Sequence, residues 1–446
     1  MDLITKAVAA AIAQGAPAAA SNTAPDSLAD AYRRLKAAIG QLAGGADVLA
    51  AIASLEAAPD TPALRLALSK AVATARAPDD MAVLFAAQAL LKQLPPPEAA
   101  PLQASMEKSA LVSNYAVVKV GFATDRQRDL GKPAAQRFNN ERNNSSGSNA
   151  GLSYGHCEIS IPRDHRMGEL ESPSLWRLEF RADPARHVVL LDAEVEDQTR
   201  FFAGIAAQLK ASASGSAFIF IHGYNVSFED AARRTGQMAY DLGFDGAPVF
   251  YSWPSQGDVA RYTVDENNIE WSTPHLQAFL TDFLQKTEAA KVYLIGHSMG
   301  NRGLARAVAG LIETRPELAR RIAEIILTAP DIDADVFQQE IAPRLTAAQH
   351  PVTLYASSED LALAASKLVH GYRRAGDSGE GMLLLAGVET IDATGVDTGF
   401  LKHSYFAERR SALSDMFYLI HDNARADQRF LDPVDTPRGR YWTFKP

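Results

Sequence analysis

The sequence is poor in cysteine, with Cys157 as the one cysteine among its 446 residues. A single cysteine excludes an intramolecular disulfide and gives no sign of an oxidising compartment. The sequence has no group of cysteines and histidines with the spacing of a metal site, and no glycine-rich loop of the phosphate-binding kind. It therefore offers no motif for a structural metal or a bound nucleotide.

The sequence also lacks an apolar run of membrane-spanning length and an excess of basic residues. Its net charge of −9 argues against nucleic acid as a partner, because phosphate binding needs a basic surface. Asp2 and the alanine-rich residues after it are a poor match to a secretory signal. We therefore expect a cytoplasmic protein without a transmembrane segment, whose 446 residues are enough for more than one domain.

The first hundred residues predict a small helical domain. Residues 1–26 form an N-terminal segment and linker, and apolar residues then recur at helical spacing from Leu28 onward. Prolines at 95–97 and Pro101 mark its end, which predicts a helical bundle over 27–97 and a second domain over 98–446. The bundle has no polar cluster suited to chemistry. It is either a structural or self-association element or an adaptor for a protein partner, and the sequence leaves both open.

From about residue 115 the pattern changes to strands, which then alternate with helices in the way typical of a parallel sheet. We expect a doubly wound, mostly parallel α/β sheet. Predicted strands cover 115–122, 155–162, 176–180, 188–191, 217–221, 248–253, 292–295, 322–327, 352–356 and 388–391. Predicted helices cover 197–209, 228–242, 274–287, 301–313 and 406–420. Residues 137–151 are expected to form a loop, and residues 425–446 to pack along the surface without regular structure.

The most informative stretch is Gly296-His-Ser-Met-Gly300, a G-x-S-x-G sequence between a predicted buried strand and a predicted helix. This context makes the motif a nucleophile elbow, with Ser298 at the tip of a strained turn. Glycines two residues before and after the serine let strand and helix approach closely. Ser298 is the candidate nucleophile.

A serine hydroxyl needs a base within hydrogen-bonding reach, and the base needs an orienting acid. When the serine lies on an elbow, the chain order is nucleophile, acid, histidine. His403 follows the last predicted strand and is the candidate base, with His370 as the other histidine in that part of the chain.

The acid has several candidates. Asp360 follows the second strand after the elbow strand, which is the commoner place for it, and is the preferred candidate. Asp331 and Asp333 follow the first strand after the elbow, and Glu359 is a further alternative. The aspartates that are not used are expected to cap the helices that follow them.

The oxyanion hole is expected to combine two backbone N–H groups, from Met299 and from Tyr224 in the loop after the strand over 217–221. The side chain of Tyr224 or Asn225 is a further candidate donor. His222, which precedes Gly223, is expected to shape this loop by hydrogen bonding rather than to act as a base.

These motifs together resemble those of the α/β-hydrolases, and specifically a bacterial branch of hydrolase-like proteins of unknown function. The resemblance covers about residues 115–405 and leaves the helical bundle outside it. It rests on His222-Gly-Tyr-Asn225, Tyr251-Ser-Trp-Pro254, Gly296-His-Ser-Met-Gly300, Ala329-Pro-Asp-Ile-Asp-Ala-Asp-Val-Phe337 and His403-Ser-Tyr405, with Ala123-Thr-Asp-Arg126 and Ser153-Tyr-Gly-His156 upstream.

The resemblance implies a serine-dependent carboxylic ester hydrolase that needs no metal or organic cofactor and acts on a small-molecule or lipid-like ester. A peptidase, thioesterase or acyltransferase would use the same groups. The alternative outside enzymes is a binding or scaffold module with a hydrolase fold, in which the helical domain recruits a partner.

Overall fold

The computed structural model describes residues 28–58, 61–75, 114–144, 151–172, 182–256, 261–347, 350–358, 371–394 and 412–444, with isolated positions between 8 and 12 and between 82 and 90. Contacts divide the chain into two compact units, one built mainly from Met1–Ala104 and the other mainly from the residues after it. Each unit has a hydrophobic core of its own. The predicted domain boundary near residue 97 lies outside the described residues.

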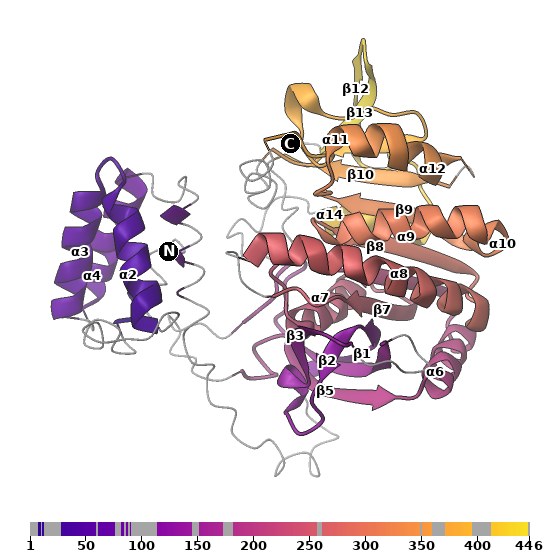
Figure 1. The fold of residues 1–446 in the computed structure, drawn as a ribbon, viewed down its shortest axis with the longest axis horizontal. Helices are drawn as coiled ribbons and strands as arrows, with labels where there is room; N and C mark the ends of the chain where they lie inside the picture. Colours follow the sequence, from indigo (N-terminus) through magenta and orange to yellow (C-terminus); the bar gives the residue numbers. More distant parts are fainter. Residues whose placement is uncertain are drawn as a thin grey trace. The chain divides into compact units, whose positions relative to one another are not determined.

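The first unit contains the helices α2 (Leu28–Gly40), α3 (Gly45–Ala57) and α4 (Pro62–Thr74), drawn in indigo in Figure 1. Leu35 and Ile39 are fully buried in its core, as their helical spacing predicts. The Tyr32 hydroxyl donates to a carboxylate oxygen of Glu56 at 2.8 Å and so ties α2 to α3. These three helices confirm the helical structure predicted for this part of the chain, whereas most of residues 76–97 lie outside the described residues.

The second unit is organised around a sheet that has 11 strands within the described residues, in the order β12-β13-β11-β10-β9-β8-β6-β7-β1-β4-β5. Antiparallel pairing is confined to its two ends, β12-β13 and β1-β4-β5, and the strands between them run parallel. The strands are β1 (Tyr115–Thr124), β4 (Ser153–Pro162), β5 (Val189–Glu196), β6 (Ser216–Ile221), β7 (Gly246–Ser252), β8 (Lys291–His297), β9 (Ile322–Thr328), β10 (Val352–Ala356), β11 (Val388–Asp392), β12 (Leu431–Thr436) and β13 (Gly439–Phe444).

Strand order reverses at β6, which lies between β7 on one side and β8 on the other. In an open parallel sheet, such a reversal leaves a crevice beyond the carboxyl ends of the strands, where functional groups gather. The loops that follow β6 and β8 therefore begin side by side, although 75 residues separate Ile221 from Gly296, its partner in the register. This is the place where the predicted elbow and oxyanion loop meet.

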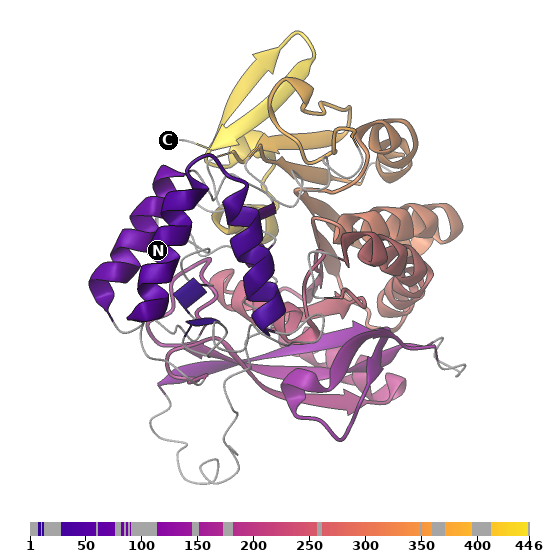
Figure 2. The same ribbon diagram turned by 60° about the vertical axis from the view of Figure 1, so that its left-hand side comes forward.

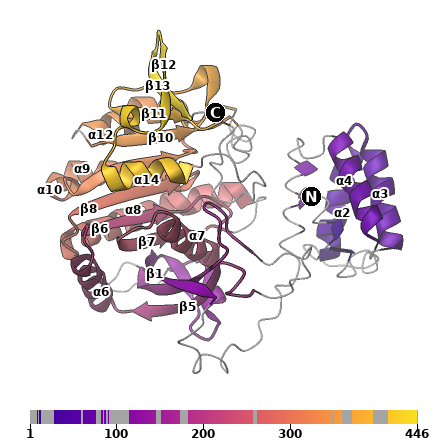
Figure 3. The same ribbon diagram turned by 180° about the vertical axis from the view of Figure 1, so that it is seen from behind.

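Helices cover both faces of the sheet (Figures 1 and 3). On one face Phe202 of α6 packs against Phe283 of α8, and Gly303 of α9 contacts α8 closely. On the other face Tyr293 donates to the Ile420 carbonyl of α14 at 3.0 Å. The helices of this unit are α6 (Gln198–Ala211), α7 (Phe228–Asp241), α8 (Tyr262–Lys286), α9 (Gly300–Thr314), α10 (Pro316–Ala319), α11 (Ala334–Val336), α12 (Ala342–Thr346) and α14 (Ala412–Asp422). The predicted α/β-hydrolase architecture is confirmed.

The C-terminal tail corrects one prediction. It forms the hairpin β12-β13 at one end of the sheet, with β1, β4 and β5 at the other end, as Figure 2 shows. Trp442 of β13 lies opposite Ile391 of β11 and is largely buried. The prediction of an irregular surface segment is therefore wrong. The strands are not recognised from the sequence because a half-exposed edge hairpin with a proline at 433 has a weak strand pattern.

Two further predictions are wrong in part. Residues 138–142, expected to be loop, form the short strand β3 (Phe138–Arg142), which pairs with β2 (Arg126–Arg128). Helix α8 begins twelve residues before the predicted start at Pro274, which lies inside it. A proline normally starts a helix or breaks it, because it lacks an N–H group, and here the long helix tolerates the lost bond. The strand expected over 176–180 lies outside the described residues.

In the part of the chain that the structure describes, no helix is long and apolar enough to cross a membrane. The same residues contain no group of three or more acidic, histidine or cysteine side chains that could hold a metal ion.

Candidate active site

Ser298 lies at a strained turn between β8 and α9. Its φ angle is +48°, in the left-handed region, which costs a residue with a side chain about 1–2 kcal/mol. Hydrogen bonds hold this conformation from both sides. The Ser298 N–H donates to the Thr328 carbonyl at 3.0 Å, and its own carbonyl accepts from the N–H of Asn301 at 3.1 Å and of Asp331 at 3.2 Å. The sharp turn is therefore fixed by the end of β9 and the first turn of α9.

The two glycines of the motif are required by close packing. A Cβ atom on Gly296 would lie 2.1 Å from the Asn301 side-chain oxygen, and one on Gly300 would lie 2.2 Å from the His222 carbonyl oxygen. Both distances are far shorter than any van der Waals contact. The strand, turn and helix predicted around Ser298 are thus present. As predicted, the two glycines allow the strand and the helix to approach closely.

The Ser298 side chain is 1% exposed, and its Oγ has no hydrogen-bond partner among the residues that the structure describes. A buried hydroxyl without a partner is uncommon and calls for a functional explanation. The next residue, Met299, is the N-cap of α9. The Met299 N–H therefore lies at the helix N-terminus, where backbone N–H groups lack partners within the helix and the dipole favours negative charge.

The loop after β6 lies directly against Ser298. A Cβ atom on Gly223 would come within 3.0 Å of the Ser298 Cβ and 2.9 Å of His297 Nδ1. Tyr224, the candidate oxyanion donor, follows in this loop and is 9% exposed. The structure therefore brings together Ser298, Met299 and the Gly223–Tyr224 peptide.

The far end of this loop is held by hydrogen bonds that its N–H groups donate to α8 and to the segment before it. Asn225 has a φ angle of +60°, and its N–H donates to an Asp265 carboxylate oxygen at 3.3 Å. Val226 N–H donates to the Ser255 hydroxyl at 3.2 Å, and that hydroxyl donates to Asp265 at 2.6 Å. Burial raises the pKa of Asp265 above its usual value, although the hydrogen bonds from Ser255 and the backbone oppose the shift.

His222 holds the near end of the loop and is neutral. Its ring stacks on Trp253 with centroids 5.1 Å apart, and the Trp253 indole N–H donates to the His222 carbonyl at 2.8 Å. Burial, together with the nearby Arg126 guanidinium, lowers the pKa of His222 well below 6.5. Burial also lowers the pKa of His297 to about 3, with a further contribution from Arg234. Neither His222 nor His297 is therefore suited to act as a base near neutral pH.

Two of the alternative acids have other partners. Asp331 is 1% exposed and forms ion pairs with Arg302 and Arg374, each at 3.3 Å. Asp333 caps the short helix α11, accepting from the N–H groups of Asp335 and Val336. The preferred acid Asp360, the candidate base His403, and the alternatives Glu359 and His370 lie outside the described residues.

Residues 197–420 match the profile of a family described as alpha/beta hydrolase of unknown function, DUF900. This chain belongs to that family. It is therefore an α/β-hydrolase, and the matched region contains the elbow and the loop after β6. Residues 1–146 match a second profile, described as the Het-E N-terminal domain. A comparison with curated proteins gives no match.

Several solved structures are similar to parts of this chain at low identity. Lipase B from Aspergillus fumigatus is 13% identical, with a TM-score of 0.26, over 40% of this chain and 44% of the lipase. A predicted CIB-like hydrolase from Thermoplasma acidophilum is 15% identical, with a TM-score of 0.28, over 47% of this chain and 86% of its own. Phospholipase PlaB from Legionella pneumophila is 11% identical, with a TM-score of 0.25, over 51% of this chain and 68% of the phospholipase. The hydrolase thus spans less than half the length of the fungal lipase.

Sequence reasoning missed three polar residues that shape this site. Asn301 donates from its side chain to the carbonyls of Ser298 and Thr328, at 3.2 and 3.0 Å. Arg126 and Ser252 form a buried hydrogen-bond network with the His222 side chain. Both belong to sequence motifs that carry the family resemblance, Ala123-Thr-Asp-Arg126 and Tyr251-Ser-Trp-Pro254. Their presence in these motifs was the available signal, but nothing in the sequence indicates what they contact.

Proposed function

We propose that this hydrolase cleaves carboxylic esters through a covalent acyl-enzyme formed on Ser298. The observation that carries the proposal is the buried Ser298 hydroxyl, which has no partner among the described residues. Ser298 lies just before the start of α9 and against the Gly223–Tyr224 peptide. A nucleophile and two backbone N–H groups at one point are what acyl transfer needs.

In the proposed reaction, the Ser298 oxygen forms a bond to the ester carbonyl carbon while His403 takes the hydroxyl proton. The carbonyl electron pair moves onto oxygen, and the N–H groups of Met299 and Tyr224 stabilise that charge. The tetrahedral intermediate collapses by breaking the bond to the alkoxy group, which leaves as an alcohol with the proton from His403. Water then releases the acid from Ser298 by the same steps in reverse order.

Asp360 is the proposed orienting acid for His403. The engagement of Asp331 by two arginines and of Asp333 in a helix cap supports this choice, because either aspartate would have to give up those partners. The proposed reaction needs only groups of the chain and water.

The test is covalent labelling of the folded, full-length chain with a fluorophosphonate probe, followed by mass-spectrometric mapping of the modified residue. We expect one label, on Ser298, and hydrolysis of p-nitrophenyl esters whose rate depends on acyl-chain length. Heat-unfolded protein should not react, because activation of the serine requires the folded site.

The matched control is Ser216→Ala, which removes a serine that is 4% exposed at the opposite end of the parallel strands. This variant should label like the wild type. A folded chain that neither labels nor hydrolyses any ester would contradict the proposal and favour a binding module. A label on another serine would mean that the nucleophile is wrong.

A further inference from the structure

A continuous chain of hydrogen bonds leads from a buried arginine to the carbonyl of the Gly223–Tyr224 peptide. Arg126 is fully buried, and its Nε donates to the Ser252 hydroxyl at 2.8 Å. Ser252 Oγ lies 3.1 Å from His222 Nε2, and His222 Nδ1 lies 2.7 Å from the Gly223 carbonyl oxygen. Every link is buried.

The proton positions in this chain follow from its arginine end. A guanidinium can only donate, so Ser252 Oγ accepts from Arg126, and its own hydrogen is left to donate to His222 Nε2. A neutral imidazole then carries its single proton on Nδ1, which donates to the Gly223 carbonyl. The opposite tautomer would place two acceptors 2.7 Å apart at that carbonyl. The depressed pKa of His222 agrees with a neutral ring.

The Gly223 carbonyl and the Tyr224 N–H belong to the same planar peptide unit. In a trans peptide they point in opposite directions, so fixing the carbonyl on His222 also fixes the direction of the N–H. Arg126 holds the other end of the loop as well, because its Nη2 donates to the Val226 carbonyl at 2.7 Å. One buried cation thus fixes residues 222–226 at both ends.

Among the residues that the structure describes, the hydrogen-bond acceptors of Arg126 are all neutral. Besides Ser252 and Val226, they are the Asn140 side-chain oxygen at 2.9 Å and the carbonyls of Ser255 at 3.1 Å and Asn139 at 3.3 Å. Burying a cation among neutral dipoles is costly and lowers the pKa of Arg126 to about 10, despite the charges of Asp265, Asp125 and Asp230. Hydrogen bonds in a chain polarise one another, so this cation also strengthens the Tyr224 N–H as a donor.

We propose that Arg126 and Ser252 are positioning residues of the oxyanion hole, which select the Nδ1–H tautomer of His222 and thereby orient and polarise the Gly223–Tyr224 peptide. This inference rests on the proposed function, because it assigns the Tyr224 N–H to the oxyanion. It makes the chain from Arg126 to Gly223 a fixed electrostatic support for a charge that appears only during the reaction.

The test compares Ser252→Ala with the wild type. The substitution removes the hydroxyl that donates to His222 and leaves the backbone unchanged. We expect kcat for ester hydrolysis to fall by about 10- to 100-fold with KM nearly unchanged, somewhat less than the loss of a whole oxyanion donor. Affinity for a trifluoromethyl ketone, which forms a tetrahedral adduct with an oxyanion, should fall by a similar factor. Arg126→Lys, which keeps the charge but loses the fork of donors, should act in the same direction.

Ser160→Ala is the matched control, because Ser160 is also a fully buried strand serine, whose hydroxyl accepts from Val189 N–H at 3.1 Å. It should alter stability slightly and leave both kcat and the ketone affinity unchanged. An equal loss of kcat in Ser160→Ala and Ser252→Ala would show a general packing effect and overturn the positioning role.

A readout that does not need activity separates this inference from the proposed function. In ring-15N-labelled full-length protein, NMR should show His222 as the neutral Nδ1–H tautomer, and Ser252→Ala should change that signal. An Nε2–H or doubly protonated His222 in the wild type would overturn the inference even if esters are hydrolysed. A wild type with the expected tautomer that neither labels nor hydrolyses would overturn the proposed function, and the positioning role with it.

Discussion

Replacement of Ser298 by alanine is expected to reduce kcat/KM for ester hydrolysis by about a million-fold, the size of effect seen when a serine nucleophile is removed from an intact site. The hydroxyl is lost while the loop after β6 and the N-terminus of α9 remain. Any residual rate should reflect substrate binding and oxyanion stabilisation alone. The measurement is steady-state hydrolysis of p-nitrophenyl esters, with fluorophosphonate labelling of the same samples.

Ser298→Gly provides the matched variant, because it removes the nucleophile and the strain together. At a φ angle of +48°, glycine avoids a cost of about 1–2 kcal/mol, while it adds about 0.5–1 kcal/mol of backbone entropy to the unfolded chain. The first effect is the larger one, so this variant should be at least as stable as the wild type in urea unfolding and just as inactive as Ser298→Ala. Activity retained in either variant would show that Ser298 is not the nucleophile.

The central strands could be predicted because their signal is local. Residues 217–221 and 292–295 are continuous apolar runs, and the structure buries them in the parallel part of the sheet. The edge elements carry a weaker signal. Strand β3 is Phe138-Asn-Asn-Glu-Arg142, a polar run that forms a strand because it pairs with β2. Nothing within those five residues indicates that pairing.

The same distinction applies to the site. The elbow could be predicted because its strand, turn and glycines are consecutive in the sequence. The role of Arg126 could not, because its partners Val226 and Ser255 lie 100 and 129 residues further along the chain. An arginine in a sequence is normally assigned to the surface, and only the fold shows that this one is fully buried. Residues that act through long-range contacts are thus the ones that sequence reasoning misses.

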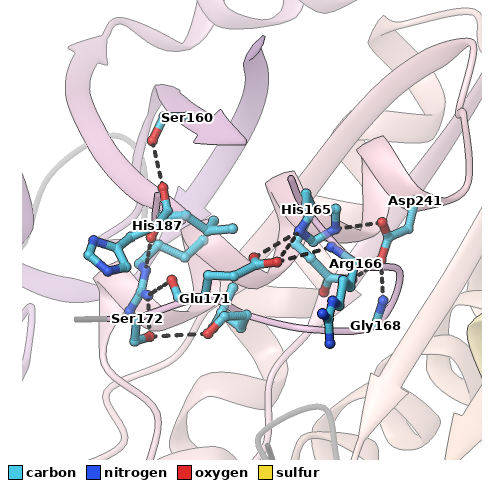
Figure 4. A network of polar contacts seen from close by, with 12 residues as sticks. Ser160, His165, Arg166, Gly168, Glu171, Ser172, His187 and Asp241 are labelled. Carbon is cyan, nitrogen blue, oxygen red and sulfur yellow. Dashed lines mark hydrogen bonds and ion pairs between the residues drawn. The ribbon is translucent and has the colours of Figure 1, made fainter. Parts of the chain in front are cut away.

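A second large effect is expected at His165. This residue lies on the loop after β4, between the carboxylates of Glu171 and Asp241 (Figure 4). Its Nδ1 lies 2.8 Å from Glu171 and its Nε2 lies 2.7 Å from Asp241, the last residue of α7. The side chains of His165 and Asp241 are buried, with 2% and 3% exposed, and that of Glu171 is partly buried, with 15% exposed. Asp241 also accepts from the Gly168 N–H at 2.6 Å, so the loop is fixed to the C-terminus of α7.

Burial alone would lower the pKa of His165, but its hydrogen bonds with Asp241 and Glu171 outweigh this and raise the pKa to about 9. His165 is therefore an imidazolium at neutral pH. Burial opposes the shift of Glu171 as well, yet its hydrogen bond with His165 lowers the pKa of Glu171 below 4.5. The three groups form a largely buried charged cluster in which both carboxylates pair with the same cation.

His165→Gln is expected to lower the free energy of unfolding by about 3–5 kcal/mol at pH 6, because it leaves two carboxylates without their buried cation. A double variant, His165→Gln with Glu171→Gln, should recover part of this loss by removing one of those charges. His156→Gln is the matched control, since His156 lies 3.4 Å from both Glu194 and Glu196 and its side chain is 14% exposed. It should cost no more than about 1 kcal/mol, as ion pairs near solvent do. The measurement is urea unfolding of the full-length chain, recorded with a signal that reports on the hydrolase unit.

The pH dependence gives this prediction its sign. A histidine whose folded pKa is raised contributes fully below its unfolded value of about 6.5, and its contribution is lost as pH rises through about 9. Glu171 has a lowered folded pKa, so its contribution is present above its unfolded value and is lost as pH falls through the folded one. The stability difference between wild type and His165→Gln should therefore be largest from about pH 4.5 to 6.5 and shrink on both sides. A difference that grows from pH 6.5 to 9 would contradict a buried imidazolium and assign His165 a neutral packing role.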